Sequence, residues 1–188
     1  MHQDNCFCSQ IKKIKLKTKV SIILFKKEKF LPSNTAHLSL KSLLNSECFE
    51  RGHKDSSLEE SFINSKEYQP LLLFPSEDSI ELTDSYLDQF DKEINLIVPD
   101  GTWRQAKKVH RREPLLADIP HIKITPTQRS KYLLRRQKFE YGLCTHEAIA
   151  LALGIIESQN IKDNLLANFS TFQDAHLKNR TIYQKEIT

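Results

Sequence analysis

Four short runs of β-branched and other apolar residues divide the chain and predict buried strands. They cover residues 20–25, 71–74, 94–98 and 122–125. Helical patterns lie between and after them: one capped by Asn34-Thr35 and ending near residue 45, one after Gly101, one over about 145–157 and one over about 161–178. Strands that alternate with helices in this way predict an α/β domain with a mostly parallel sheet and helices on both faces.

Three of the four predicted strands are followed by residues that can carry chemistry. Asn34-Thr35 lies past the first strand, Pro75-Ser76 follows the second, and residues 100–103 follow the third. Ligands of parallel α/β sheets bind beyond the carboxyl ends of the strands, so a site is expected where these segments meet. The acidic stretch over 77–93 is interpreted as a solvated surface away from any polyanion.

The third of these segments, Asp100-Gly101-Thr102-Trp103, joins a strand to a helix. Gly101 permits a tight turn and Thr102 can cap the helix. Asp100 is placed to act as a base or to hold an ammonium group, and Trp103 offers a flat face for a nucleobase. A capping aspartate and an aromatic plug under the helix explain the same pattern equally well.

Two basic segments flank this turn. The helix after Gly101 carries five cations on one face, and a second basic segment with interleaved aromatic residues follows over 128–139. Such a pair of segments favours RNA over a small acidic ligand. The cations singled out for RNA phosphates are Arg104, Lys107, Lys108, Arg111, Arg112, Arg129 and Arg135.

The helix expected from Thr145 is apolar on nearly every face, which predicts burial. Thr145 is its expected N-cap, Glu147 suits the dipole of the first turn, and the free N–H groups there could bind a ligand carboxylate. Capping alone explains both residues. Cys144 is interpreted as a small buried residue and not as a nucleophile.

Composition bounds the class of protein. With 188 residues, 39% hydrophobic and 28% charged, the chain fits one globular domain over 1–188. The longest apolar run is too short to span a membrane and no secretory signal is recognised, so a cytoplasmic protein is expected. A net charge of +4 does not by itself prove a nucleic-acid partner. The four cysteines are too sparse for a disulfide framework.

Several motifs, taken together and in order, resemble the DTW-domain family over about residues 6–180. The first is Asp100-Gly101-Thr102-Trp103 followed by Arg-Gln-Ala-Lys-Lys. The others are Pro32-Ser33-Asn34-Thr35, Gln69-Pro70 to Phe74-Pro75, Tyr132-Leu133-Leu134-Arg135 and Cys144-Thr145-His146-Glu147-Ala148.

The resemblance implies a tRNA-uridine aminocarboxypropyltransferase, which transfers the 3-amino-3-carboxypropyl group of S-adenosylmethionine (SAM) to N3 of a uridine and releases methylthioadenosine. In the bacterial type the target is the variable-loop uridine at tRNA position 47. The implied fold is SPOUT-like, with a C-terminal trefoil knot around SAM. A SPOUT-type RNA methyltransferase and an inactive RNA-binding module are the alternatives, and monomer and homodimer both stay open.

The resemblance also assigns roles to residues. Asp100 and Trp103 are the implied catalytic residues, and Asn34 joins the cations that bind RNA. The implied SAM site comprises Phe74, Pro75, Ser76, Asp100, Gly101, Thr102, Leu143, Thr145 and Glu147.

The sequence departs from the family pattern in two places. Bacterial relatives carry a Cys-x-x-Cys pair before a Cys-x-Cys, whereas the lead-in at 1–18 holds only Cys6-Phe7-Cys8, so no zinc is expected. Many members have a histidine after the first strand, where this chain has Phe25-Lys26-Lys27-Glu28.

Overall fold

The structure is a computed structural model that describes residues 6–51, 58–63, 66–101, 105–106, 113–134 and 142–186, with the side chains of the last helix described as far as residue 179. Its centre is a six-stranded sheet in the order β2-β1-β5-β3-β6-β4. Every pairing in it is parallel. The strands are β1 Lys19–Phe25, β2 Ser46–Arg51, β3 Tyr68–Leu73, β4 Ile80–Glu81, β5 Glu93–Asp100 and β6 His121–Lys123.

All four predicted strands are confirmed as β1, β3, β5 and β6, and two further strands were missed. β2 is polar at most positions and half-exposed along the sheet edge, so it lacks the apolar run of a buried strand. β4 is only two residues long. The carboxylates of the acidic stretch are mostly exposed as expected, but Leu82 in the same stretch is 3% exposed and belongs to the core.

The predicted helices that end near residue 45, cover about 145–157 and cover about 161–178 are present with shifted ends, whereas two short helices over 60–63 and 84–87 were not predicted. The helices are α1 Ala36–Ser42, α2 Glu60–Ile63, α3 Asp84–Leu87, α5 Thr145–Ile156 and α6 Gln159–Glu186, with 3-10 turns η2 Cys8–Gln10 and η3 Pro114–Leu116. α1 ends before residue 45 because Leu43 is extended, with φ −100° and ψ 129°. Of the helix predicted after Gly101, the structure describes residues 105–106, which are helical.

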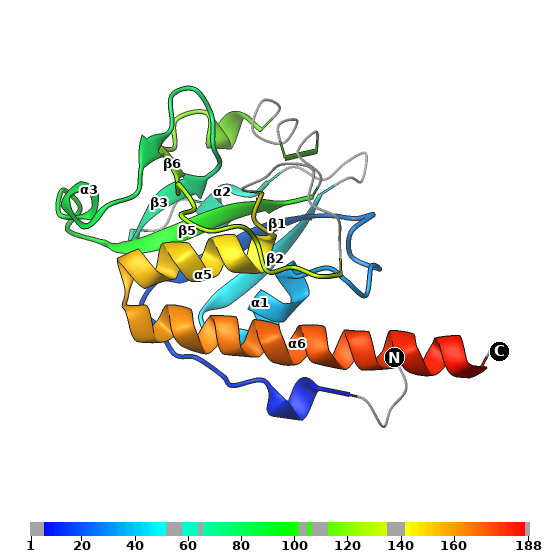
Figure 1. The fold of residues 1–188 in the computed structure, drawn as a ribbon. Helices are drawn as coiled ribbons and strands as arrows, with labels where there is room; N and C mark the ends of the chain where they lie inside the picture. Colours follow the sequence, from blue (N-terminus) through cyan, green and yellow to red (C-terminus); the bar gives the residue numbers. More distant parts are fainter. Residues whose placement is uncertain are drawn as a thin grey trace.

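Helices cover both faces of the sheet, as predicted (Figure 1). On one face, Val20, Leu96 and Ile122 pack with Ile149 and Leu153 of α5. On the other face, Ile23, Leu72 and Ile97 pack with α2 and η3. Neighbouring residues of a strand point to opposite faces, so a strand buried on both sides reads as a continuous apolar run.

α6 lies outside α5 and carries the N-terminal lead-in (Figure 1). Asn168 accepts a hydrogen bond from Lys12 N at 3.0 Å and donates to Lys12 O at 2.9 Å. Phe7 packs edge-on against Phe172, with 5.4 Å between the ring centroids. No helix in the described part of the chain combines the length and apolar character needed to cross a membrane.

Candidate functional site at the carboxyl edge of the sheet

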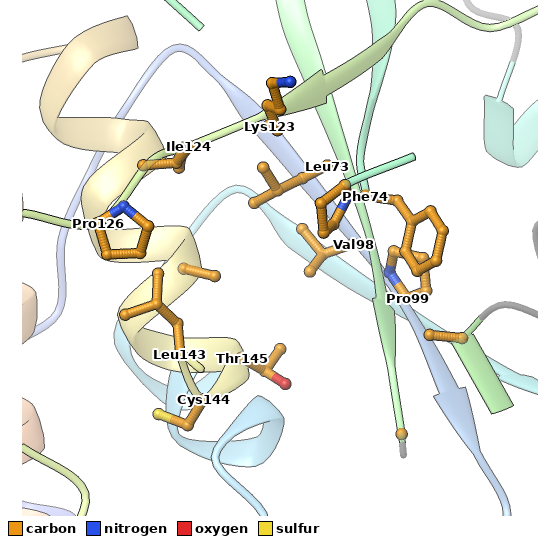
Figure 2. A pocket seen from close by; sticks show the side chains of 14 residues that line it. Leu73, Phe74, Val98, Pro99, Lys123, Ile124, Pro126, Leu143, Cys144 and Thr145 are labelled. Carbon is orange, nitrogen blue, oxygen red and sulfur yellow. The ribbon is translucent and has the colours of Figure 1, made fainter. Parts of the chain in front are cut away.

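A cavity of about 310 Å³ opens at the carboxyl ends of β3 and β5. Figure 2 shows it bounded by these strand ends, by the segment after β6 and by the start of α5. This is the edge at which ligands of parallel α/β sheets bind. Its lining residues are Leu73, Phe74, Pro75, Val98, Pro99, Gly101, Ala106, Lys123, Ile124, Pro126, Leu143, Cys144, Thr145 and Ala148.

Asp100 ends β5 between two residues that line this pocket, Pro99 and Gly101. The carboxylate is 4% exposed and accepts hydrogen bonds on both oxygens. Thr145 Oγ1 donates to Oδ1, and Asn34 Nδ2 donates to Oδ2 at 2.7 Å. These two donors fix the orientation of the Asp100 side chain, which lies next to the pocket but is not itself among the lining residues.

Gly101 is needed for the turn after Asp100. Its φ of +155° lies in the region that side chains rarely adopt. A Cβ there would also lie 3.1 Å from Gln105 Oε1 and 3.4 Å from Phe25 Cδ2. The structure thus accounts for the glycine that the motif singled out.

The prediction that Thr145 caps α5 is wrong, because Cys144 is the N-cap and Thr145 is the first helical residue. Cys144 and Glu147 form a capping box, in which Cys144 N donates to Glu147 Oε2 at 3.0 Å. The Thr145 hydroxyl is instead committed to Asp100. Burial, with the neighbouring Glu147 carboxylate, raises the pKa of the Cys144 thiol well above its ordinary value. Cys144 was expected to be buried, whereas it is half-buried and lines the pocket, and its lack of a nucleophilic role stays a prediction.

Glu147 is 5% exposed and faces the loop before residue 134, outside the pocket lining. Its carboxylate accepts from Ser130 Oγ at 2.6 Å and from Lys131 N at 2.9 Å. These contacts tie that loop to the start of α5. A contact of Glu147 with SAM stays a prediction.

His146 lies behind the pocket and joins three helices. Its Nε2 donates to Leu165 O at 2.9 Å in α6, so Nδ1 is the acceptor for Ser39 Oγ of α1 at 2.8 Å. Burial lowers the pKa of His146 to about 4. The ring is therefore neutral near pH 7, and it packs between the helices with both nitrogens hydrogen-bonded.

The structure brings together five residues of the predicted SAM site in the lining: Phe74, Pro75, Gly101, Leu143 and Thr145. Ser76 lies outside it, where its hydroxyl contacts His121 Nδ1 at 3.2 Å and its N–H donates to Ser79. Asn34, assigned to RNA, is 2% exposed and committed to Asp100 and to the start of α1. The assignment of Asn34 to RNA stays a prediction. The remaining assignments fall on residues outside the described ranges and also stay predictions: Thr102 for SAM, Trp103 for catalysis, and Arg104, Lys107, Lys108, Arg111, Arg112 and Arg135 for RNA.

The segment after β6 was missed as part of the site. Lys123, Ile124 and Pro126 line the pocket because β6 pairs with β3, which brings that segment beside Phe74. Pro126 just after the predicted strand was a signal of a turn at the strand end. Nothing in the sequence showed which strand lies beside β3.

A second cavity, of about 520 Å³, shares Ile124, Pro126 and Leu143 with the first. It runs between the loop after β6 and the helices α5 and α6. Three cations line it: Arg129, which the sequence analysis assigned to RNA, with Lys131 and Lys162.

Metal ligands are not gathered in the described part of the chain, where no three His, Cys, Asp or Glu side chains form a group that could hold an ion. Cys6 and Cys8 are exposed free thiols there. The expectation about zinc stays a prediction.

A parallel sheet with helices on both faces and a pocket at its carboxyl edge defines the class of α/β domains, in which this edge is the usual position of a ligand site. Within this class, the chain belongs to the DTW-domain family, because the DTW domain matches residues 1–177.

Relatives with assigned names are similar over part of the chain. It is 32% identical over 115 residues to tRNA-uridine aminocarboxypropyltransferase 2 of Drosophila melanogaster, covering 61% of this chain and 45% of that protein. It is 32% identical over 97 residues to the protein of the same name from Macaca fascicularis, covering 51% of this chain and 33% of that protein. This chain thus spans less than half the length of these relatives.

A solved structure shares the fold. The SAM-dependent rRNA:acp-transferase Tsr3 from Vulcanisaeta distributa matches with a TM-score of 0.55 and 18% identity, over 89% of this chain and 81% of that chain. At this identity the likeness concerns the fold.

Proposed function

We propose that this protein is a tRNA-uridine aminocarboxypropyltransferase that moves the 3-amino-3-carboxypropyl group of SAM to N3 of a tRNA uridine. The observation that carries the proposal is Asp100, a buried carboxylate fixed by Asn34 and Thr145 at the edge of the pocket. Membership of the DTW-domain family and the names of the relatives support the same activity.

The residues of the pocket fit SAM in chemistry. Phe74, Pro75 and Ile124 supply apolar surface for an adenosyl group. Asp100 supplies an anion for an ammonium group, and the first turn of α5 supplies a positive dipole end for a carboxylate. When bound, SAM supplies an electrophilic methylene beside a positively charged sulfur, and its C–S bond breaks as methylthioadenosine leaves.

Asp100 has two possible roles in this reaction. N3 of the uridine must lose its proton to form the new N–C bond, and a carboxylate base could accept that proton. The alternative is that Asp100 holds the amino group of the transferred arm in line with N3. Both oxygens of Asp100 accept a hydrogen bond, from Asn34 and Thr145, and this geometry orients the carboxylate for either role.

The finer predictions belong to the same proposal. We infer a SPOUT-like fold with a C-terminal trefoil knot, a single domain over 1–188, a cytoplasmic location and a variable-loop target at position 47. The exposed Arg129, in the second cavity beside the pocket, supports RNA binding on this side of the molecule. Trp103 stays the predicted stacking partner of the target base.

The test is the by-product of the reaction with SAM and unmodified tRNA. Purified protein is expected to release methylthioadenosine, and nucleoside mass spectrometry is expected to find aminocarboxypropyl-uridine. Asp100→Asn is the matched control, because it keeps the shape of the side chain and removes its charge. Release of S-adenosylhomocysteine would identify a methyltransferase instead, and SAM turnover by neither route would overturn the proposal.

A further inference from the structure

The loop over residues 26–35 connects β1 to α1 (Figure 1), and residues at its two ends contact the Asp100–Gly101 turn. At its start, Phe25 lies against Gly101, where a Cβ would be 3.4 Å from the ring. At its end, Asn34 donates to Asp100 at 2.7 Å. Both ends of this loop are therefore held at the Asp100–Gly101 turn, next to the pocket.

Backbone hydrogen bonds fix the loop in a series of tight turns. Glu28 N donates to Phe25 O at 2.8 Å, Leu31 N to Glu28 O at 3.1 Å and Asn34 N to Leu31 O at 2.9 Å. His37 Nε2 donates to Lys29 O at 2.8 Å. The direction in which the loop presents its side chains is thus set by the fold.

This fixed loop presents apolar side chains to solvent. Phe30 is 74% exposed and Leu31 is 40% exposed. A second loop adds Leu133, at 70%, and is joined to the first by the hydrogen bond from Tyr132 Oη to Ser33 O. Three of the five exposed large hydrophobic residues in the described ranges thus lie on these two connected loops.

Exposed cations lie on the same two loops as the exposed ring. Lys26, Lys27 and Lys29 are exposed on the same loop, and Lys131 is exposed on the second. Lys29 Nζ lies 5.9 Å from the centroid of the Phe30 ring and also pairs with Glu50. An exposed aromatic ring among cations is the chemistry that binds single-stranded nucleic acid, in which bases stack and phosphates are neutralised.

We propose that Phe30 stacks on an unpaired base of the substrate RNA, next to the nucleotide that enters the pocket, while Lys27 neutralises a neighbouring phosphate. The proposal rests on the proposed function for the identity of the RNA. The occupant is a single-stranded segment of tRNA, since a folded loop could bring a stacked base and the target base to one edge of the sheet together. The positive charge around the ring favours this occupant over a protein partner.

The experiment measures the affinity of the full chain for unmodified tRNA without SAM. Phe30→Ala is expected to weaken binding about tenfold, since stacking contributes about 1–3 kcal/mol per base. Phe30→Trp is expected to restore it. Leu44→Ala is the matched control, because Leu44 is 61% exposed just before β2, at the amino end of that strand and away from the carboxyl ends that border the pocket, and its removal should leave affinity unchanged.

Salt dependence separates the two parts of the surface. Lys27→Ala is expected to make the slope of log K against log salt shallower by the amount that corresponds to about one phosphate contact. Phe30→Ala is expected to leave this slope unchanged. Wild-type tRNA affinity in Phe30→Ala would overturn the proposal and assign the surface to a protein partner. Equal weakening by Phe30→Ala and Phe30→Trp would also overturn it, since the ring would then have only a structural role.

The outcome is distinguishable from that of the proposed function. If Phe30→Ala weakens tRNA binding but the wild-type protein releases no methylthioadenosine, the proposed RNA-binding surface is supported and the proposed transfer activity is rejected. If the wild-type protein releases methylthioadenosine while Phe30→Ala binds tRNA normally, the proposed transfer activity is supported and the proposed RNA-binding role of Phe30 is rejected.

Discussion

The two sides of the pocket are built from different kinds of side chain. On one side, Thr145 lines the pocket and donates to Asp100, which lies next to the lining in a buried polar cluster with Asn34. On the other side, Phe74, Pro75 and Ile124 form an apolar wall. The two sides therefore have different roles. The apolar wall determines the shape of the pocket, and the polar side holds a carboxylate in a fixed position beside it.

The two sides also differ in how they are held. The apolar wall consists of direct continuations of β3 and β6, which are paired neighbours in the sheet. The polar side joins the end of β5 to the starts of α1 and α5, and His146 with Ser39 links these two helices behind it. Changes to single polar groups should therefore affect reactivity or stability more than changes to the wall do.

The largest effect is expected from Asp100→Asn, which removes the charge from the polar side. We expect the rate of methylthioadenosine release to fall by about 10²–10⁴-fold, the range for loss of an acid–base group. If Asp100 instead holds the amino group, SAM affinity falls as well and the pH profile of the residual rate is unchanged. A melting curve checks the fold, and a rate within about twofold of wild type would remove Asp100 from the mechanism.

Acid is expected to weaken the support behind the polar side through His146. With a pKa of about 4 in the folded protein against an ordinary value of 6.5, the folded state binds fewer protons than the unfolded state between these two pH values. The free energy of unfolding should therefore fall as pH drops from 6.5 to 4, by up to about 3 kcal/mol.

Urea unfolding measured at several pH values tests this prediction. His146→Gln should flatten the acid dependence, whereas His37→Gln, at a half-buried site on the neighbouring helix, should retain it. An acid dependence that survives His146→Gln would contradict the assignment to His146.

Removing one donor to Asp100 should have an intermediate effect. Thr145→Val keeps the shape of the side chain but deletes the hydroxyl that donates to Oδ1. Since a hydrogen bond to a charged group contributes about 1.5–3 kcal/mol, we expect kcat/KM to fall at least about tenfold. Thr145→Ser restores the hydroxyl and should recover most of the rate; equal loss in both variants would argue for a packing role.

The smallest effect is expected from adding bulk to the pocket lining. Ala148→Leu extends from α5 into the cavity, and overpacking of about 1 kcal/mol would weaken SAM binding about fivefold. Calorimetric titration with SAM measures the change. Ala167→Leu, on the exposed surface of α6, is the matched control, and unchanged SAM affinity in Ala148→Leu would place SAM elsewhere.

The sequence predicted the strands with buried faces on both sides, because such strands read as continuous apolar runs. It missed β2, whose half-exposed edge position leaves it polar, and β4, which is too short to form a pattern. In the site, Gly101 was found because its turn needs a residue that tolerates its φ. The cap of α5 was misassigned because local pattern favoured Thr145, whereas its hydroxyl is used by Asp100, 45 residues away in the chain.

The sequence by itself determined the α/β class, the four central strands and the motifs at their carboxyl ends, because periodicity and turn chemistry are properties of neighbouring residues. Only the tertiary structure decided that β6 lies beside β3, that Asn34 and Thr145 share one carboxylate, and that Phe30 is turned outward on a fixed loop. These depend on contacts between distant segments, which the order of residues along a chain does not specify locally.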